Sequence, residues 1–365
     1  MAQAISAQRS RTAWPSVVFA TALPLMAIFV NHHTVLLRDD DIVSTCGADA
    51  WGQCDLPMPE DGLTYIQASA GGEHTVLLCS DGSVVACGRR LFGRCLIPRL
   101  DKAVTYVQVS AGCNHTVLLR SDGSAVACGA NFDGQRNLPP LEEGMTYVQV
   151  SAGGNHTVLL RNDGSAIACG ANFAGQCNLP ALEDGVTYTQ VSAGVYHTVL
   201  LRSDGSAIAC GDDLFGRCDI PTLGEGLTYT QVSAGGEHTV LLRSDGSVVA
   251  CGANFDGQCD LPELEDGVQY TQVFAGGVHT VLLRSDGFAV ACGNNRSGQC
   301  DIPALEEPAR YVPGRGEMVP VETAPDLVVQ LFVERTPADG LLATCRSLAG
   351  EELARWTPSD AEIAS

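Results

Sequence analysis

The chain has 365 residues and a formal net charge of −21, from 42 acidic and 21 basic residues. This balance argues against a surface that follows nucleic-acid phosphates, because such a surface needs clustered lysine and arginine. It favours solubility and a protein partner with a basic surface, and the length suits one large domain with a tail.

The first segment, residues 1–32, precedes the regular part of the chain. Two arginines lead into an apolar run, residues 14–30, which is interrupted by Pro15 and Pro24. The run resembles a signal peptide or a short anchor, although no small-x-small cleavage site follows it and its length is marginal for a membrane span. A degenerate first strand is the other interpretation. We expect a degenerate first strand and a cytoplasmic protein, with secretion or membrane anchorage as the alternative.

From residue 33 the chain repeats with a fixed step of 41 residues. One histidine marks each unit, at His33, His74, His115, His156, His197, His238 and His279. A tyrosine keeps the same step, at Tyr65, Tyr106, Tyr147, Tyr188, Tyr229, Tyr270 and Tyr311. A period of this size indicates a propeller, a solenoid or an array.

Each unit consists of short apolar runs separated by turn residues. Residues 147–180 hold three clear runs, Val-Gln-Val-Ser-Ala, His-Thr-Val-Leu-Leu-Arg and Ser-Ala-Ile-Ala-Cys-Gly, separated by Gly-Gly and Asp-Gly. Asp-Gly is the strongest hairpin signal, because a type I′ turn needs positive φ. Gly-Gln-Cys-Asn-Leu-Pro is a shorter fourth run. Four antiparallel strands repeated seven times predict an all-β fold, a seven-bladed β-propeller over residues 33–312. An open solenoid would need polar caps at both ends.

The ring is expected to close through both termini. The first unit lacks the strand before His33, and Tyr311 continues the tyrosine step at the far end. Residues 309–312 should therefore pair beside residues 33–38, which protects the strand edges of the ring.

The tail, residues 313–365, leaves the repeat. Leu327 to Val333 is a strand candidate, and Leu341 to Arg355 predicts a β-hairpin. The sequence around Arg346, Arg-Ser-Leu-Ala-Gly-Glu-Glu-Leu-Ala, resembles the opening hairpin of ubiquitin-like folds over a short stretch.

The motif Ala-Gly-x-x-His-Thr, then Asp-Gly, then Cys-Gly-x-Asn-x-x-Gly-Gln-Cys-x-Leu-Pro resembles the repeat of the regulator of chromosome condensation (RCC1) family. The resemblance implies a seven-bladed propeller, in agreement with the number of units. Some members of that family are nucleotide exchange factors for a small GTPase and bind chromatin, and others are attached to ubiquitin-ligase catalytic domains. This chain departs from the family by carrying cysteine where tryptophan is common, at Cys87, Cys128, Cys169, Cys210, Cys251 and Cys292.

Sixteen cysteines could suggest a disulfide framework. Most form pairs eight residues apart, such as Cys169 and Cys177, and no Cys-x-x-Cys spacing typical of zinc sites is present. Arg136 replaces the second member in the third unit without disturbing the motif. We interpret the cysteines as mainly free, buried thiols, with disulfides across each loop as the alternative, and we expect no metal and no cofactor.

The seven histidines are interpreted as structural residues that hydrogen-bond backbone groups in their own blade. A catalytic site would need one special copy, and no catalytic triad or phosphate-binding loop stands out, so we expect no catalytic residue and no enzymatic activity. The expected function is a protein-binding scaffold. A regulator of a small GTPase, resembling an exchange factor, or the substrate-binding part of a ubiquitin-ligase system is the alternative.

Candidate partner-binding residues lie where the units differ, in the connections after the first and third strands. Both connections lie at one end of an up-and-down blade, and loops on a rigid scaffold often carry recognition. Aromatic and arginine side chains contribute most to such interfaces. The candidates are Glu73, Arg89, Arg90, Phe92, Tyr196, Asp212, Asp213, Phe215 and Glu237. We expect the protein to be a monomer.

Overall fold

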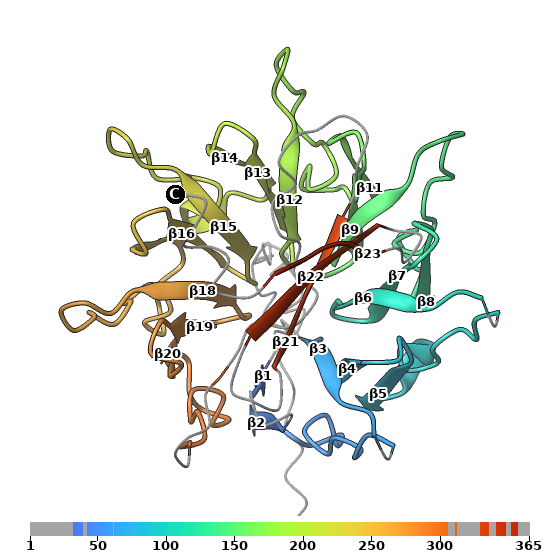
Figure 1. Ribbon diagram of the computed structural model, residues 1–365. Helices are drawn as coiled ribbons and strands as arrows, with labels where there is room; N and C mark the ends of the chain where they lie inside the picture. The colour runs from blue at the N-terminus through green and yellow to red at the C-terminus, as the bar shows by residue number, and fades with distance from the viewer. Residues whose placement is uncertain are drawn as a thin grey trace, which may run out of the picture.

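The computed structural model describes residues 32–38, 42–60, 62–101, 103–305 and 311, and the backbone of 329–335, 341–347 and 352–356. The predicted all-β propeller is confirmed. Figure 1 shows the blades in chain order around a ring, with the first strands directed like spokes at its centre. The only helical elements in the described ranges are two short 3-10 turns, η1 (Leu91–Gly93) and η2 (Leu214–Gly216).

Each blade is an antiparallel sheet whose strands follow one another in the chain. The first blade holds β1 (His33–Leu37) and β2 (Val43–Gly47). The other six hold three strands each: β3 (Tyr65–Ala70), β4 (His74–Cys79) and β5 (Val84–Gly88); β6 (Tyr106–Ala111), β7 (His115–Arg120) and β8 (Ala125–Gly129); β9 (Tyr147–Ala152), β10 (His156–Arg161) and β11 (Ala166–Gly170); β12 (Tyr188–Ala193), β13 (His197–Arg202) and β14 (Ala207–Gly211); β15 (Tyr229–Ala234), β16 (His238–Arg243) and β17 (Val248–Gly252); β18 (Tyr270–Ala275), β19 (His279–Arg284) and β20 (Ala289–Gly293).

The expectation of a fourth strand in each unit is wrong. The fourth run forms turns, as residues 175–177 do after β11. Asn172 explains the difference, because its side-chain oxygen accepts the backbone N–H of Cys177 at 2.9 Å and its side-chain nitrogen donates to Asn178 at 2.8 Å. Such local side-chain bonds compete with strand pairing.

The core lies between consecutive blades. Val117 and Leu119 of β7, for example, pack against Tyr147 and Val150 of the next blade. The second strand of each complete blade is buried along nearly its whole length, because a blade covers it on both sides. This agrees with the continuous apolar runs of the sequence, which are typical of strands with two covered faces.

The ring closes through Tyr311. This residue forms an antiparallel bridge with Arg38, in the register by which Tyr106 pairs with Arg120. It is 3% exposed and packs in a cluster with Leu36 and Val281, and its hydroxyl donates to the carbonyl of Pro303 at 2.8 Å. Closure by both termini is therefore confirmed, and residues 309, 310 and 312 of the expected strand lie outside the described residues.

The seven histidines join neighbouring blades, so the expectation of backbone partners in their own blade is wrong. Each Nε2 lies 2.8 to 3.0 Å from a threonine hydroxyl of the next blade, in the pairs His33–Thr75, His74–Thr116, His115–Thr157, His156–Thr198, His197–Thr239, His238–Thr280 and His279–Thr34. The last pair returns to the first blade. A single sequence unit cannot reveal a partner that only the packing of two blades supplies.

The protonation of these histidines follows from their partners. The Thr157 hydroxyl donates its one proton to the carbonyl of Gln135 at 2.7 Å, so it accepts from Nε2–H of His115. Each imidazole therefore carries a proton on Nε2, and burial favours its neutral form. Burial, reinforced by His156 and Arg136, lowers the pKa of His115 to about 3, and burial lowers that of His156 to about 4.

The tail forms an antiparallel sheet of three strands, β21 (Val329–Arg335), β22 (Leu341–Ser347) and β23 (Glu352–Trp356), in that order. The predicted hairpin corresponds to β22 and β23, and the strand candidate Leu327 to Val333 overlaps β21 at residues 329–333. The ubiquitin-like resemblance stays a prediction. Of the N-terminal segment, residues 1–31 lie outside the described residues. No helix within the described ranges is long and apolar enough to cross a membrane.

Tyr311→Ala should lower the free energy of unfolding by about 3 kcal/mol, because it removes a buried aromatic side chain from the closing contact. Tyr188→Ala, at the equivalent position inside the ring, is the matched control and should cost a similar amount. Denaturant unfolding of both variants measures this. A Tyr311→Ala protein as stable as the parent, beside a destabilised Tyr188→Ala protein, would show that the ring does not depend on closure.

Acidification should destabilise the ring well before carboxylates are protonated. The folded pKa values of about 3 to 4 lie below the ordinary 6.5, so the unfolded chain binds more protons in this window. The stabilisation is complete above about pH 6.5 and falls as the pH drops toward about 4. The melting temperature should therefore decrease between pH about 7 and 5. The lowered carboxyl pKa values, such as that of Asp204, act only below about 4. A flat profile down to pH 5 would contradict neutral buried histidines.

Candidate functional site

The candidate residues lie at one end of the blades, as the sequence predicted. Gly88 at the end of β5 pairs with His74 at the start of β4, so the connection after a third strand begins beside the turn before the histidine. Arg89 N–H donates to the carbonyl of Glu73 at 2.8 Å, and Asp212 N–H to that of Tyr196 at 2.9 Å. We call the turns before the histidines and the connections after the third strands the loop face.

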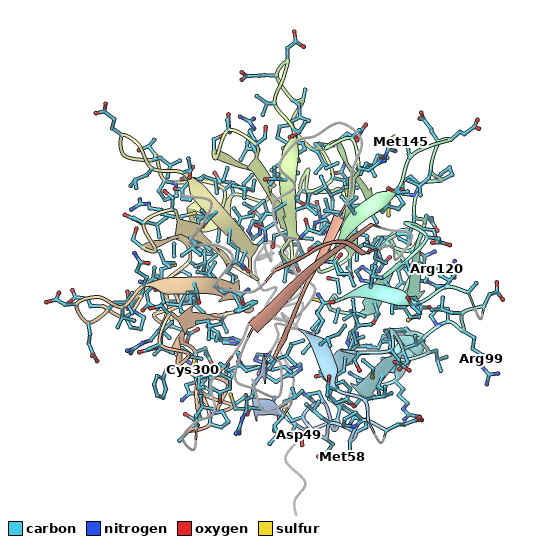
Figure 2. The ribbon with its side chains drawn as sticks, viewed as in Figure 1. Asp49, Met58, Arg99, Arg120, Met145 and Cys300 are labelled. Carbon is cyan, nitrogen blue, oxygen red and sulfur yellow. The ribbon has the colours of Figure 1, made fainter. Side chains whose placement is uncertain are left out.

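The linkers between blades leave from the other end of each first strand. In Figure 2 their side chains, Arg99 and Met145 among them, point outward from the rim of the ring. Glu142 and Glu143 are exposed there. The acidic linkers are thus separated from the loop face by the length of a strand.

Two connections of the loop face differ from the others because arginine replaces a buried glutamine. In the common form, the side-chain oxygen of Gln135 accepts the backbone N–H of Asp133 at 3.0 Å. Arginine has no acceptor. Arg94 Nε instead donates to the carbonyl of Leu91 at 3.1 Å, and Arg217 Nε to that of Leu214 at 3.0 Å. The two connections in which arginine replaces glutamine are the ones that form the 3-10 turns η1 and η2.

These turns hold Phe92 and Phe215 in the left-handed region, at φ of 60° and 67°. No other residue except glycine has positive φ in the described part of the chain. The conformation costs a side-chain-bearing residue roughly 1–2 kcal/mol. Both rings are nevertheless exposed, by 46% and 47%, and each packs edge-on against a phenylalanine of the next blade, Phe132 or Phe255, at 4.9 Å. Strain at exposed residues motivates a hypothesis of function.

Large apolar side chains concentrate on these connections. Thirteen are exposed among the described residues, and eight of them lie three or four positions after the last strand of blades one to six: Trp51, Leu91, Phe92, Phe132, Phe173, Leu214, Phe215 and Phe255. We call these eight the apolar crown. Exposed apolar side chains gathered in one region mark interaction sites on soluble proteins.

The first of the two turns carries a basic cluster. Arg89 forms an ion pair with Glu73 at 2.9 Å, and its guanidinium carbon lies 4.3 Å from the centre of the Trp51 ring. Arg94 is 1% exposed and donates to Glu73 at 3.4 Å and to the carbonyl of Cys113 at 3.1 Å. Burial lowers the pKa of Arg94. Arg90 is exposed to solvent.

The second turn carries an acidic cluster. Asp212 lies 3.8 Å from Arg217, which is buried and donates to the carbonyl of Gly236 at 3.0 Å. Asp213 is exposed and accepts the backbone N–H of Cys218 at 2.8 Å. Burial raises the pKa of the nearby Tyr196, and the charges of Asp212 and Glu237 raise it further. The nine candidates therefore form two clusters, three blades apart, and not one site.

The centre of the ring offers no comparable site. Small residues of five blades, from Ala111 to Gly277, line an axial cavity of about 40 Å³, which has room for water only. Adjacent turns close on one another there, as Gly154 N–H donates to the carbonyl of Gly194 at 3.0 Å. Within the described residues, no group of three histidine, cysteine or acidic side chains could hold a metal ion.

The sequence pattern of the regulator of chromosome condensation (RCC1) repeat matches five units, residues 106–135, 147–176, 188–217, 229–258 and 270–299. The chain is an RCC1-like β-propeller. Among solved structures, Prp20p from Saccharomyces cerevisiae has 20% identity and a TM-score of 0.58, covering 84% of this chain and 86% of its own. Human WBSCR16 has 18% identity and a TM-score of 0.57, covering 68% and 81%. The ectodomain of the Arabidopsis thaliana receptor kinase ACR4 has 18% identity and a TM-score of 0.57, covering 73% and 90%. These likenesses show the fold. No curated protein matches the sequence.

The cysteines of this RCC1-like propeller contribute hydrogen bonds. The fifteen within the described residues are free thiols. Cys169 Sγ–H donates to the carbonyl of Gln135 in the preceding blade at 3.8 Å, and Cys177 Sγ–H to that of Ala171 at 3.2 Å. Burial raises their pKa to about 12 and about 11. Arg136 takes the place of a cysteine by donating to the carbonyl of Gly129 at 2.9 Å.

Sequence reasoning missed most of the apolar crown. Phe132, Phe173 and Phe255 recur after the same asparagine in their units, whereas the candidates were chosen at positions where the units differ. Their exposure of 72% to 76% shows that they do not fill the core. The recurring phenylalanine beside a glycine turn was the signal available in the sequence.

Phe92→Gly should leave the free energy of unfolding unchanged or raise it by up to about 1 kcal/mol. Glycine relieves roughly 1–2 kcal/mol of left-handed strain, which offsets the loss of an exposed ring contact. Phe173→Gly, outside the left-handed region, is the control and should destabilise slightly. Urea unfolding measures both. A loss above about 2 kcal/mol in Phe92→Gly would mean that the ring is a packing element and not a recognition element.

Proposed function

We propose that this RCC1-like propeller is a non-catalytic protein-binding scaffold that recognises its partner through the loop face. The observation that carries the proposal is the pair of strained, exposed phenylalanines. A chain selected for stability alone would place glycine at Phe92 and Phe215, as it does at the other positions with positive φ. Retaining an exposed aromatic ring there at a cost to folding is explained by a contact with another molecule.

Of the two clusters on the loop face, the acidic one fits a partner with a basic surface. Phe215 and Phe255 supply apolar rings, and Asp213 places an exposed carboxylate beside them. A lysine or arginine of the partner can pair with the carboxylate while its alkyl stem covers the rings. The net charge of −21 attracts a basic protein at long range.

Regulation of a small GTPase is the second candidate. The structure of Prp20p was reported together with its binding to Gsp1p and histones, and another structure shows Kap60 bound to yeast RCC1 (Prp20). At this identity the likeness supports a role in binding proteins without naming the partner. Nucleotide release from a panel of small GTPases, with and without the chain, separates an exchange factor from a scaffold.

Tyr196→Ala with Phe215→Ala should weaken partner binding by roughly 2 kcal/mol or more, because both side chains belong to the acidic cluster. Proteins retained by the immobilised chain, identified by mass spectrometry and then titrated in purified form, provide the measurement. Glu183→Gln with Asp184→Asn in a linker is the control and should bind as the parent does. Loss of binding in the linker variant alone would place the site at the rim.

A further inference from the structure

The two strained turns are copies of one structure with opposite charge. Both read Leu-Phe-Gly-Arg-Cys, form one 3-10 turn and place phenylalanine at positive φ against the next blade. The two residues before them are Arg89 and Arg90 in one copy, and Asp212 and Asp213 in the other. The apolar shape is thus conserved between the copies while the charge is inverted.

This arrangement meets the requirement of a two-fold interface. In such an interface one surface binds the same surface of a second chain. That surface must therefore carry both members of each complementary pair. The turns occupy equivalent positions of two blades that are three apart in a ring of seven, so they lie on the same side of the ring and nearly across it from each other. When the loop faces of two chains meet about a two-fold axis, the basic turn of each chain lies over the acidic turn of the other. The two apolar crowns then lie between the chains.

We propose that the loop face binds the loop face of a second copy of this chain, with Arg90 of each copy beside Asp213 of the other. The inference rests on the proposed function and names its partner. The basic surface that the acidic cluster fits is supplied by the equivalent turn of the second chain. The sequence alone led to the expectation of a monomer, because it did not show that both turns share a face and a backbone conformation.

Arg90 and Asp213 are the charges available for this contact. Arg89 is paired with Glu73, and Asp212 lies beside the buried Arg217, so these charges are occupied within their own chain. Arg90 and Asp213 occupy equivalent positions of the repeat and are exposed. The carboxylate of Asp213 accepts one backbone N–H and keeps its other oxygen for the second copy.

The net charge of −21 on each chain opposes this association at long range. At physiological ionic strength the Debye length is about 8 Å, so repulsion between the distant acidic rims is screened more than contacts within the interface. Burial of the apolar crown supplies the non-electrostatic attraction. We therefore expect self-association to be weak in low salt and stronger near physiological salt.

The test uses the full chain and two charge variants, Arg90→Asp and Asp213→Arg. Each substitution installs the residue type that the other turn already carries, so the turn is known to accept it. The first variant presents acidic residues at both turns and the second presents basic residues at both. Each variant alone should dissociate roughly tenfold more readily than the parent, and an equimolar mixture should recover the dimer. Analytical ultracentrifugation over a concentration series measures the dissociation constants.

Glu183→Gln with Asp184→Asn, away from the loop face, is the control and should dimerise as the parent does. Leu214→Ser should also weaken the dimer, and it serves if either charge variant melts early. A parent chain that stays monomeric at its highest soluble concentration would overturn the inference, as would a mixture no tighter than its separate components. A monomer that still captures a partner through Phe215 would leave the proposed function standing.

Discussion

The propeller depends on the bond between a histidine Nε2–H and the threonine hydroxyl of the next blade. It is buried, it recurs around the whole ring, and the last copy, His279 to Thr34, connects the two ends of the repeat array. Each threonine passes its own proton to a carbonyl of the preceding blade, so the hydroxyl joins both blades. Because each buried polar group depends on a neighbour in another blade, an incomplete ring would leave donors unpaired, which is costly.

The same bond explains the small residues at the ring centre. A Cβ on Gly153 would lie 2.7 Å from Nδ1 of His156 and would also meet the carbonyl oxygen of Gly194. The imidazole therefore occupies the space that a side chain would need, and the turns approach one another through backbone alone. Close packing at the axis leaves only a narrow cavity, so binding to other molecules falls to the connections farther from the axis.

The rigid ring allows the third connections to vary at little cost. Arg94 and Arg217 stand where Gln135 stands in its own unit, and their side chains bond different backbone groups. Thr116 and Thr239 nevertheless still donate to the carbonyls of Arg94 and Arg217. The bond between blades uses the backbone of this residue, and the side chain shapes the turn. Recognition features can therefore change in one blade without disturbing its neighbours.

The sequence by itself determined the period, the number of blades, the strands from Tyr147 to Gly170 and closure by Tyr311, because these depend on local apolar runs and on a register that counting reveals. It also located the nine candidate residues at one end of the blades. Only the tertiary structure decided the partners of the histidines, the loss of the fourth strand, the exposure of Phe132 and Phe255, and the separation of the candidates into two clusters of opposite charge. Those features arise between blades, where side chains 40 or 42 residues apart meet, and no pattern within one unit encodes which surface its neighbour presents.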